Sequence, residues 1–266
     1  MSTYTLRLSE PERARYRMMA QSARQAEADL WRAAGIVEGA HVADVGCGPG
    51  AVLALIAEDV GPSGYVTGVD SDAEAVAAAQ SEIVSTGLRN AAVRVGTAQA
   101  TGLEPASLDV AVLRHVLAHN GGIEHEIVGH LATLVRPGGA VYLVDVDLTA
   151  TRLRPVPPEL ADLVEAYVGF HRHLGNDPQV GLRLADLATD VGLVIEDFRG
   201  WYTIMEVPPG LRPPAWAARD AMVDSGVISR ADVERWGSAL QRLDDEPQRP
   251  RMFAAMFAAV CRRPDS

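Results

Sequence analysis

The sequence Val42-Ala-Asp-Val-Gly-Cys-Gly-Pro-Gly50 is typical of a buried strand that runs directly into a glycine loop. The apolar residues before the loop suit a strand with both faces covered, and the run 51–57 has the apolar spacing of a helix. Gly46, Gly48 and Gly50 permit positive φ angles and let the backbone approach a ligand closely. The first N–H groups of the following helix then face polar ligand atoms. This unit predicts a site for a nucleotide-like cofactor.

Two acids beside the loop narrow the kind of cofactor. The loop alone also satisfies the G-x-G-x-x-A fingerprint of dinucleotide sites. Asp44, however, would repel a pyrophosphate and attract an amino group. Asp70, with the neutral Ser71 beside it, ends the next apolar run and is suited to accept hydrogen bonds from ribose hydroxyls. No second mononucleotide-binding half follows Asp145, so the pattern favours an adenosine that carries an amino-acid tail.

Strands and helices alternate through the first half of the chain. After the first strand, apolar runs predict strands at 65–70, 93–95, 108–113 and 140–145. Helical spacing predicts helices at 10–34, 72–85 and 124–134. Ser71 is the expected N-cap of the helix 72–85, and Gly87 is its expected end. Such alternation predicts an α/β fold with a parallel, doubly wound sheet and crossover helices on both faces.

The chain after Asp147 is less regular. Helices are expected near 158–173, 182–191, 214–225 and 229–243, and a strand is expected at 193–198. The run 252–261 fits either a helix or a final strand. Since no repeat or disordered tract stands out, we expect residues 1–266 to form a single domain with an insertion.

Composition narrows the classes of function. The net charge of −11 argues against a broad nucleic-acid surface. No apolar stretch reaches the length of a membrane span, the first residues lack a secretory pattern, and the two cysteines fit a reducing compartment. We therefore expect a cytoplasmic protein with a small-molecule substrate and no nucleic-acid or membrane partner. All 24 basic residues are arginine, which excludes Schiff-base chemistry and a P-loop lysine.

The stretch 42–145 resembles the class I S-adenosylmethionine-dependent methyltransferases, particularly the small-molecule group that includes quinone and natural-product enzymes. Residues 44–50 match the first motif of that family, and Gly68-Val-Asp70 matches its ribose acid. The segments 108–119 and 134–139 look like its fourth motif and the turn before its fifth strand. Four matches in the right order make the resemblance specific.

The resemblance implies a Rossmann-like, seven-stranded sheet, mostly parallel with one antiparallel strand, plus a helical cap. It favours a strand for the run 252–261, paired beside 193–204. The N-terminal helix, within residues 1–34, and the insertion 207–245 are then expected to roof the substrate pocket. The implied reaction is methyl transfer from S-adenosylmethionine to oxygen, nitrogen or carbon of a small organic acceptor, by in-line displacement.

The same resemblance guides the assignment of cofactor contacts. The expected contacts are Tyr16, Asp44, Gly46, Cys47, Gly48, Gly50, Asp70, Ser71, Thr97, Ala98 and Arg114. Tyr16 is expected to close over the cofactor, with an ordinary helix contact as the alternative. The Arg114 backbone is expected at the methionine portion, and Thr97 with Ala98 at the adenine. The family usually has an aspartate where Thr97 stands, so this hydrogen bond to adenine is expected to be weaker.

Two histidines are the candidate catalytic residues. A base is needed only where the nucleophile must lose a proton. His115 and His119 follow the fourth expected strand, at the sheet edge where ligands bind in open α/β folds. A packing or capping role for His119 is the alternative. His125 and His130 are five residues apart, whereas the zincin motif needs four, so no metal site is expected.

Two other functions stay open at this point. One is a protein that binds S-adenosylmethionine without methyl transfer, as a sensor or a ligand-shaping protein. Formation of S-adenosylhomocysteine with an acceptor distinguishes it from an enzyme. The other is an NAD-dependent oxidoreductase, which predicts that NAD rather than S-adenosylhomocysteine raises the melting temperature.

Overall fold

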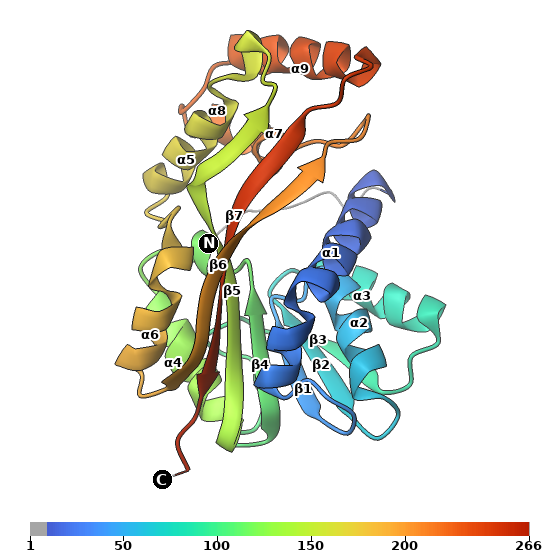
Figure 1. The fold of residues 1–266 in the computed structure, drawn as a ribbon, viewed down its shortest axis with the longest axis vertical. Coiled ribbons are helices and arrows are strands. Elements are labelled where there is room, and N and C mark those ends of the chain that lie inside the picture. The colour runs from blue at the N-terminus through green and yellow to red at the C-terminus, as the bar shows by residue number, and fades with distance from the viewer. Residues whose placement is uncertain (1–9, 266) are drawn as a thin grey trace.

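The computed structural model describes residues 10–265, and a seven-stranded sheet forms its centre (Figure 1). The strand order is β3-β2-β1-β4-β5-β7-β6, and β7 runs in the direction opposite to the other six of these strands. The bounds are β1 (His41–Val45), β2 (Tyr65–Asp70), β3 (Ala91–Val95), β4 (Leu108–Arg114), β5 (Val135–Arg154), β6 (Val194–Glu206) and β7 (Arg251–Arg262). The predicted doubly wound sheet with one reversed strand is confirmed.

Helices cover both faces of the sheet, because each packs an apolar stripe against the buried strands. Trp31, Ile56 and Tyr142 belong to a buried cluster under α1, α2 and α3, whereas Leu131 and Val141 belong to one under α4 and α6. The helices on these two faces are α1 (Glu10–Ala34), α2 (Ala51–Val60), α3 (Ala73–Thr86), α4 (Glu124–Leu134) and α6 (Leu184–Asp190). The central strands are therefore apolar on both sides, which is why their sequences are continuous apolar runs.

The N-terminus of α3 differs from the sequence prediction by one residue. Asp72 is the N-cap, and the Glu74 N–H donates to its carboxylate at 2.8 Å. Asp72 has the extended backbone that an N-cap needs, so the prediction of Ser71 as the cap was wrong. Gly87 ends α3 in the left-handed conformation, as expected.

Three of the expected later helices are divided, and the segment 182–191 forms the end of a 3₁₀ turn (Val180–Arg183) and then α6. The segment 158–173 forms a 3₁₀ turn (Pro158–Leu160) and then α5 (Leu163–His173). The segment 214–225 forms α7 (Pro214–Ala217) and α8 (Arg219–Asp224). Asp162 and Ala218 have ψ angles near zero, which tighten the chain into 3₁₀-like turns between the pieces.

The strands β5, β6 and β7 continue beyond the body of the sheet and carry a helical cap (Figure 1). We define the cap as α5, α7, α8 and α9 (Arg230–Asp245). These helices enclose a third buried cluster, which contains Leu160, Tyr167, Met222 and Trp236. β5 is 20 residues long, because its second half belongs to this extension rather than to the fully buried sheet. Within residues 10–265, we find no helix with the length and apolar character that a bilayer crossing needs.

Candidate functional site

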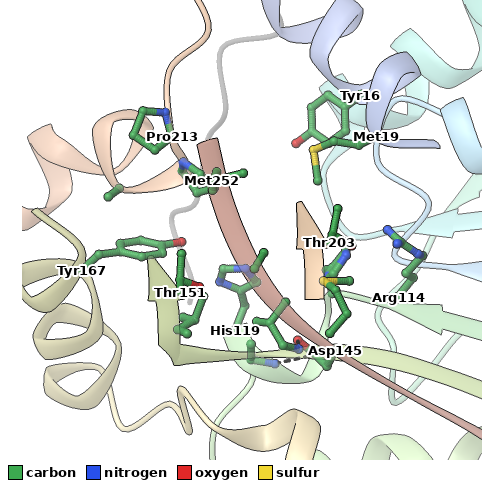
Figure 2. Close-up of a pocket in the computed structure, with 18 of the residues that line it drawn as sticks. Tyr16, Met19, Arg114, His119, Asp145, Thr151, Tyr167, Thr203, Pro213 and Met252 are labelled. Atoms are coloured by element: carbon green, nitrogen blue, oxygen red, sulfur yellow. Dashed lines mark hydrogen bonds between the residues drawn. The ribbon is translucent and has the colours of Figure 1, made fainter. Parts of the chain in front are cut away.

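A cleft of about 1690 Å³ lies between the carboxyl edge of the parallel strands, α1 and the cap (Figure 2). Ligand pockets are commonly about 300–1,000 Å³, so this cleft has room for a cofactor and a second molecule. We call the part lined by the segments after β1, β2, β3 and β4 the loop half. The part lined by α5, residues 205–215 and the extended strands is the cap half.

The glycine loop brings bare backbone to the loop half. Gly46 has φ 75°, and a Cβ at this position would collide with the Val116 side chain. Gly48 has φ 51°, and a Cβ there would meet nothing within 4 Å, because this residue faces the open cleft. Gly50 does not line the cleft; it precedes α2 with φ 84° and its α-carbon packs closely against Ala79. The loop is thus shaped for close ligand approach at Gly48.

Asp70 connects the end of β2 to this loop. The Gly48 N–H donates to Asp70 Oδ2 at 2.8 Å, and the Asp72 N–H donates to Oδ1 at 3.0 Å. A carboxylate accepts about four hydrogen bonds, so both oxygens keep capacity for ligand hydroxyls. Asp70 and Ser71 both line the cleft, where the sequence places a ribose.

Asp44 is a buried carboxylate with an unsatisfied oxygen. The residue is 2% exposed, and Asp44 Oδ2 has no hydrogen-bond partner among the described residues. Burial, with a smaller contribution from the neighbouring Asp70, raises the pKa of this carboxyl to about 7, and Arg114 opposes the shift. Buried polar atoms are normally hydrogen-bonded. The orphan oxygen on the cleft wall therefore fits a ligand that donates a hydrogen bond, such as an ammonium group.

Arg114 is held by Glu27, a residue that the sequence alone did not mark as part of the site. Glu27 of α1 is 1% exposed and accepts a hydrogen bond from Arg114 Nη2 at 2.8 Å. The Tyr142 hydroxyl donates to the same carboxylate at 2.9 Å, and Trp31 Nε1 donates at 3.4 Å. The sequence does contain one sign of this buried role, because Glu27 is an acid that stands within the apolar stripe of α1. Arg114 Nε is buried and has no partner among the described residues.

Three further predicted cofactor contacts also line the cleft. Thr97 and Ala98 line the cleft, with Thr97 exposed and Ala98 half-buried. Tyr16 of α1 also lines the cleft (Figure 2). The Cys47 thiol is buried, and burial raises its pKa, which favours the protonated thiol over the reactive thiolate.

The two candidate catalytic histidines both line the cleft. His115 has φ 57°, a left-handed backbone that costs free energy in a non-glycine residue, and its N–H donates to the Val144 carbonyl at 2.9 Å. Burial lowers the pKa of the His115 ring well below its usual value, and Arg114 adds to this effect. Burial also lowers the pKa of His119 to about 4, with a smaller contribution from His171. Both rings are therefore neutral at pH 7.

His119 belongs to a cluster of rings at the boundary between the two halves. Its ring lies 5.0 Å from that of His171, which contacts Tyr167 edge-on at 4.6 Å. His171 Nδ1 lies 2.9 Å from the Ala118 carbonyl, so this nitrogen carries the proton. Asp145 accepts the Ala118 N–H at 3.2 Å and thereby holds the turn that presents His119. Figure 2 shows Tyr167 pointing into the cleft toward His119 and Thr151.

The cap half is mainly apolar, and the sequence analysis did not predict its residues individually. Five of the seven methionines in the sequence line the cleft: Met18, Met19, Met205, Met252 and Met256. Apolar residues of the cap and its connections complete the wall: Leu148, Val156, Leu160, Leu163, Val164, Val207, Leu211, Pro213, Leu240 and Leu243. Alternate residues of a strand point to the same face, so the sequence does indicate that Met252, Ala254 and Met256 share one face of β7.

Comparison with known proteins finds methyltransferases. A family model described as a methyltransferase domain matches residues 36–190. Nocamycin O-methyltransferase from Saccharothrix syringae is 34% identical over 45% of this chain and 39% of its own length. Aklanonic acid methyltransferase from Streptomyces sp. (strain C5) is 30% identical over 48% of this chain and 58% of its own length. The chain thus spans less than two thirds of these curated relatives.

A solved structure shows the same fold. The SAM-dependent methyltransferase from Aquifex aeolicus superposes with a TM-score of 0.55 and covers 96% of this chain and 99% of its own. Its sequence identity to this chain is 14%, so this likeness concerns the fold alone.

Proposed function

Because the chain belongs to the S-adenosylmethionine-dependent methyltransferase family, we propose that it transfers a methyl group to a small organic acceptor by in-line displacement. The observation that carries the site assignment is the unpartnered Asp44 oxygen beside the glycine loop and Asp70. The names of the nocamycin and aklanonic acid relatives support a small-molecule acceptor.

The residues of the loop half would hold the cofactor. Asp44 would pair with the ammonium of the methionine portion, and Asp70 would accept from the ribose hydroxyls. Thr97 and Ala98 would contact the adenine, and Arg114 would line the methionine end. When bound, S-adenosylmethionine supplies an activated methyl group, so the protein contributes mainly alignment and exclusion of water.

His119 is the better placed of the two histidines to act as a base. It lies at the boundary of the two halves beside the His171 and Tyr167 rings, whereas His115 directly follows Arg114 at the cofactor end. Its neutral ring can accept a proton from an acceptor hydroxyl. The hydrogen bonds of Asp145 and His171 to Ala118 keep this turn in place.

Calorimetric titration with S-adenosylhomocysteine tests the cofactor site. We expect Asp70→Ala to weaken binding at least about 100-fold, because charge-assisted hydrogen bonds to the ribose are lost. Asp197→Ala is the matched control, since this aspartate lies on β6 and does not line the cleft. Unchanged affinity in Asp70→Ala would overturn the assignment. Formation of S-adenosylhomocysteine from S-adenosylmethionine with an added acceptor then tests transfer itself.

A further inference from the structure

We infer that the acceptor is a large, mainly apolar molecule that presents an acidic hydroxyl, phenolic or enolic, to the His119 boundary of the cleft. This inference rests on the proposed function, because it concerns the second molecule in the same cleft. Three observations support it: the apolar walls of the cap half, the lack of a free buried carboxylate among its described residues, and the polar side chains at the boundary with the loop half.

The floor of the cap half is an apolar face of the extended sheet. Leu153 of β5 pairs with Met252 of β7, which pairs with Met205 of β6. Directly opposite residues in a ladder point to the same face, so these three side chains form a row across the strands, and all three line the cleft. Methionine side chains adapt their shape to irregular apolar surfaces. The row is suited to the flat face of a ring system.

The opposite wall is supplied by the cap. Leu160, Leu163 and Tyr167 line the cleft on the side of α5, and Val207 with Leu211 lines it from the segment after β6. Figure 2 shows Pro213 and Tyr167 facing Met252 across the space between them. Apolar surface on both sides favours an acceptor whose apolar part is removed from water on binding.

Arg212 and Arg249, two cations of the cap half, are held by other groups of the protein. Arg212 forms a bidentate pair with Asp244, with distances of 3.0 and 2.6 Å. Arg249 donates to the Val207 carbonyl at 2.9 Å. Among the described charged residues that line the cap half, Arg152, Arg154, Arg172 and Glu165 are exposed to water.

This pairing disfavours a cationic acceptor. Within the described part of the cap half we find no buried carboxylate that is free to receive an ammonium group, since Asp244 is held by Arg212. Asp145, at the boundary, accepts the Val146 and Ala118 N–H groups. Transferring an unpaired ammonium from water into an apolar site is costly, whereas a neutral hydroxyl needs only one hydrogen-bond partner.

The boundary between the halves supplies that partner. His119, Tyr167, Thr151 and Thr203 add polar side chains to the mainly apolar wall of the cleft. In the transfer, the acceptor oxygen forms a bond to the methyl carbon while the carbon–sulfur bond breaks and its electron pair stays on sulfur. The hydroxyl proton passes to the His119 ring. Because burial lowers the pKa of His119, its ring takes this proton more readily from phenols and enols than from alcohols, whose hydroxyls are weaker acids.

Calorimetry on protein saturated with S-adenosylhomocysteine tests the size and charge of the acceptor. The probes are phenol, 2-naphthol and 2-hydroxyanthraquinone, with 2-(aminomethyl)naphthalene as the cationic comparison. We expect affinity to rise about 10-fold with each added ring, and the amine to bind at least about 10-fold more weakly than 2-naphthol. Equal affinity for phenol and the three-ring probe, or preference for the amine, would overturn the inference. Failure to saturate with S-adenosylhomocysteine would instead contradict the proposed function.

A pair of neighbouring substitutions locates the binding face. Met205 lines the cleft, whereas Ile204, the preceding residue on β6, is 57% exposed and does not line it. Met205→Glu is expected to weaken 2-naphthol binding at least about 10-fold, because the new carboxylate is forced into the apolar wall. Ile204→Glu adds the same charge on the outer face and is expected to change the affinity less than about 2-fold. Equal effects of the two variants would show that the probe does not lie on this row.

Discussion

Asp44 and Glu27 are both buried carboxylates on the wall of the cleft, but their surroundings assign them different roles. Glu27 accepts hydrogen bonds from Arg114, Tyr142 and Trp31, so its oxygens are satisfied within the protein. Asp44 Oδ2 has no partner among the described residues. A satisfied buried acid stabilises structure, whereas an unsatisfied one at a cleft is a site for a ligand donor. The same residue type therefore serves the fold in one place and binding in the other.

The raised pKa of Asp44 makes cofactor binding depend on pH. The folded protein keeps a proton on Asp44 up to about pH 7, whereas the usual carboxyl pKa is 3.8, so the ionised form becomes available only as the pH rises. An ammonium ligand needs that ionised form. We expect the affinity for S-adenosylhomocysteine to rise about 10-fold between pH 6 and pH 8. Calorimetric titrations across this range measure it.

Asp44→Asn is the control for this pH dependence. It is expected to bind more weakly at pH 8 and to lose the dependence, because the amide does not titrate. Asp145 has a pKa that burial also raises to about 7. A slope that persists in Asp44→Asn would assign the effect to Asp145 and contradict the role of Asp44.

Among the elements, α1 and the extended strands show what the sequence could and could not predict. The bounds of α1, Glu10–Ala34, were predicted correctly, because apolar residues recur at helical spacing along its length. The second half of β5 was missed. Beyond Asp147 this strand has one face toward the cleft and exposed arginines at 152 and 154, so it lacks the continuous apolar run of the buried half. Propensity and periodicity do not reveal a strand whose partners lie about a hundred residues away.

The contact of α1 with the sheet depends on the buried Glu27–Arg114 pair. Glu27→Ala leaves the Arg114 guanidinium, whose side chain is 10% exposed, without its carboxylate. We expect the free energy of unfolding to fall by about 3–5 kcal/mol, as when one partner of a buried ion pair is removed. Urea unfolding followed by circular dichroism measures this change.

The matched control is an exposed ion pair. Arg242 and Glu159 form a pair at 2.6 Å in which the side chains are 58% and 42% exposed. Arg242→Ala is expected to change the stability by less than about 1 kcal/mol. If Glu27→Ala destabilised the protein no more than Arg242→Ala, the anchoring role of Glu27 would be wrong.

At the scale of the whole molecule, the residues of the loop half could be grouped from the sequence, whereas those of the cap half could not. The loop-half residues follow strand ends, and the carboxyl ends of parallel strands meet at one edge of a sheet, so Asp44, Asp70 and Thr97 could be grouped from the sequence. The cap half is assembled from α5, residues 205–215 and the extended strands β5, β6 and β7, which meet only in three dimensions. The sequence did not reveal the roles of Glu27 and of the methionines in the row, because both depend on contacts with elements that are distant in the sequence.

Ligand binding is expected to stabilise the whole protein selectively. S-adenosylhomocysteine at 100 times its dissociation constant should add about 2.7 kcal/mol to the free energy of unfolding. NAD is expected to leave the melting temperature unchanged, because Asp44 repels a pyrophosphate. A thermal-shift experiment with both ligands measures the difference, with Asp70→Ala as the variant that loses the response. A larger shift with NAD would contradict the site assignment.

The row of Leu153, Met252 and Met205 has a consequence for how this protein acquires new acceptors during evolution. The ladders that join β5, β7 and β6 are made by backbone groups, so the register does not require particular side chains in this row. Substitutions there reshape the cap half, while the glycine loop and Asp70 lie on other elements of the fold. Divergent descendants of one gene can therefore keep the cofactor and change the acceptor through a few replacements on one face of the extended sheet.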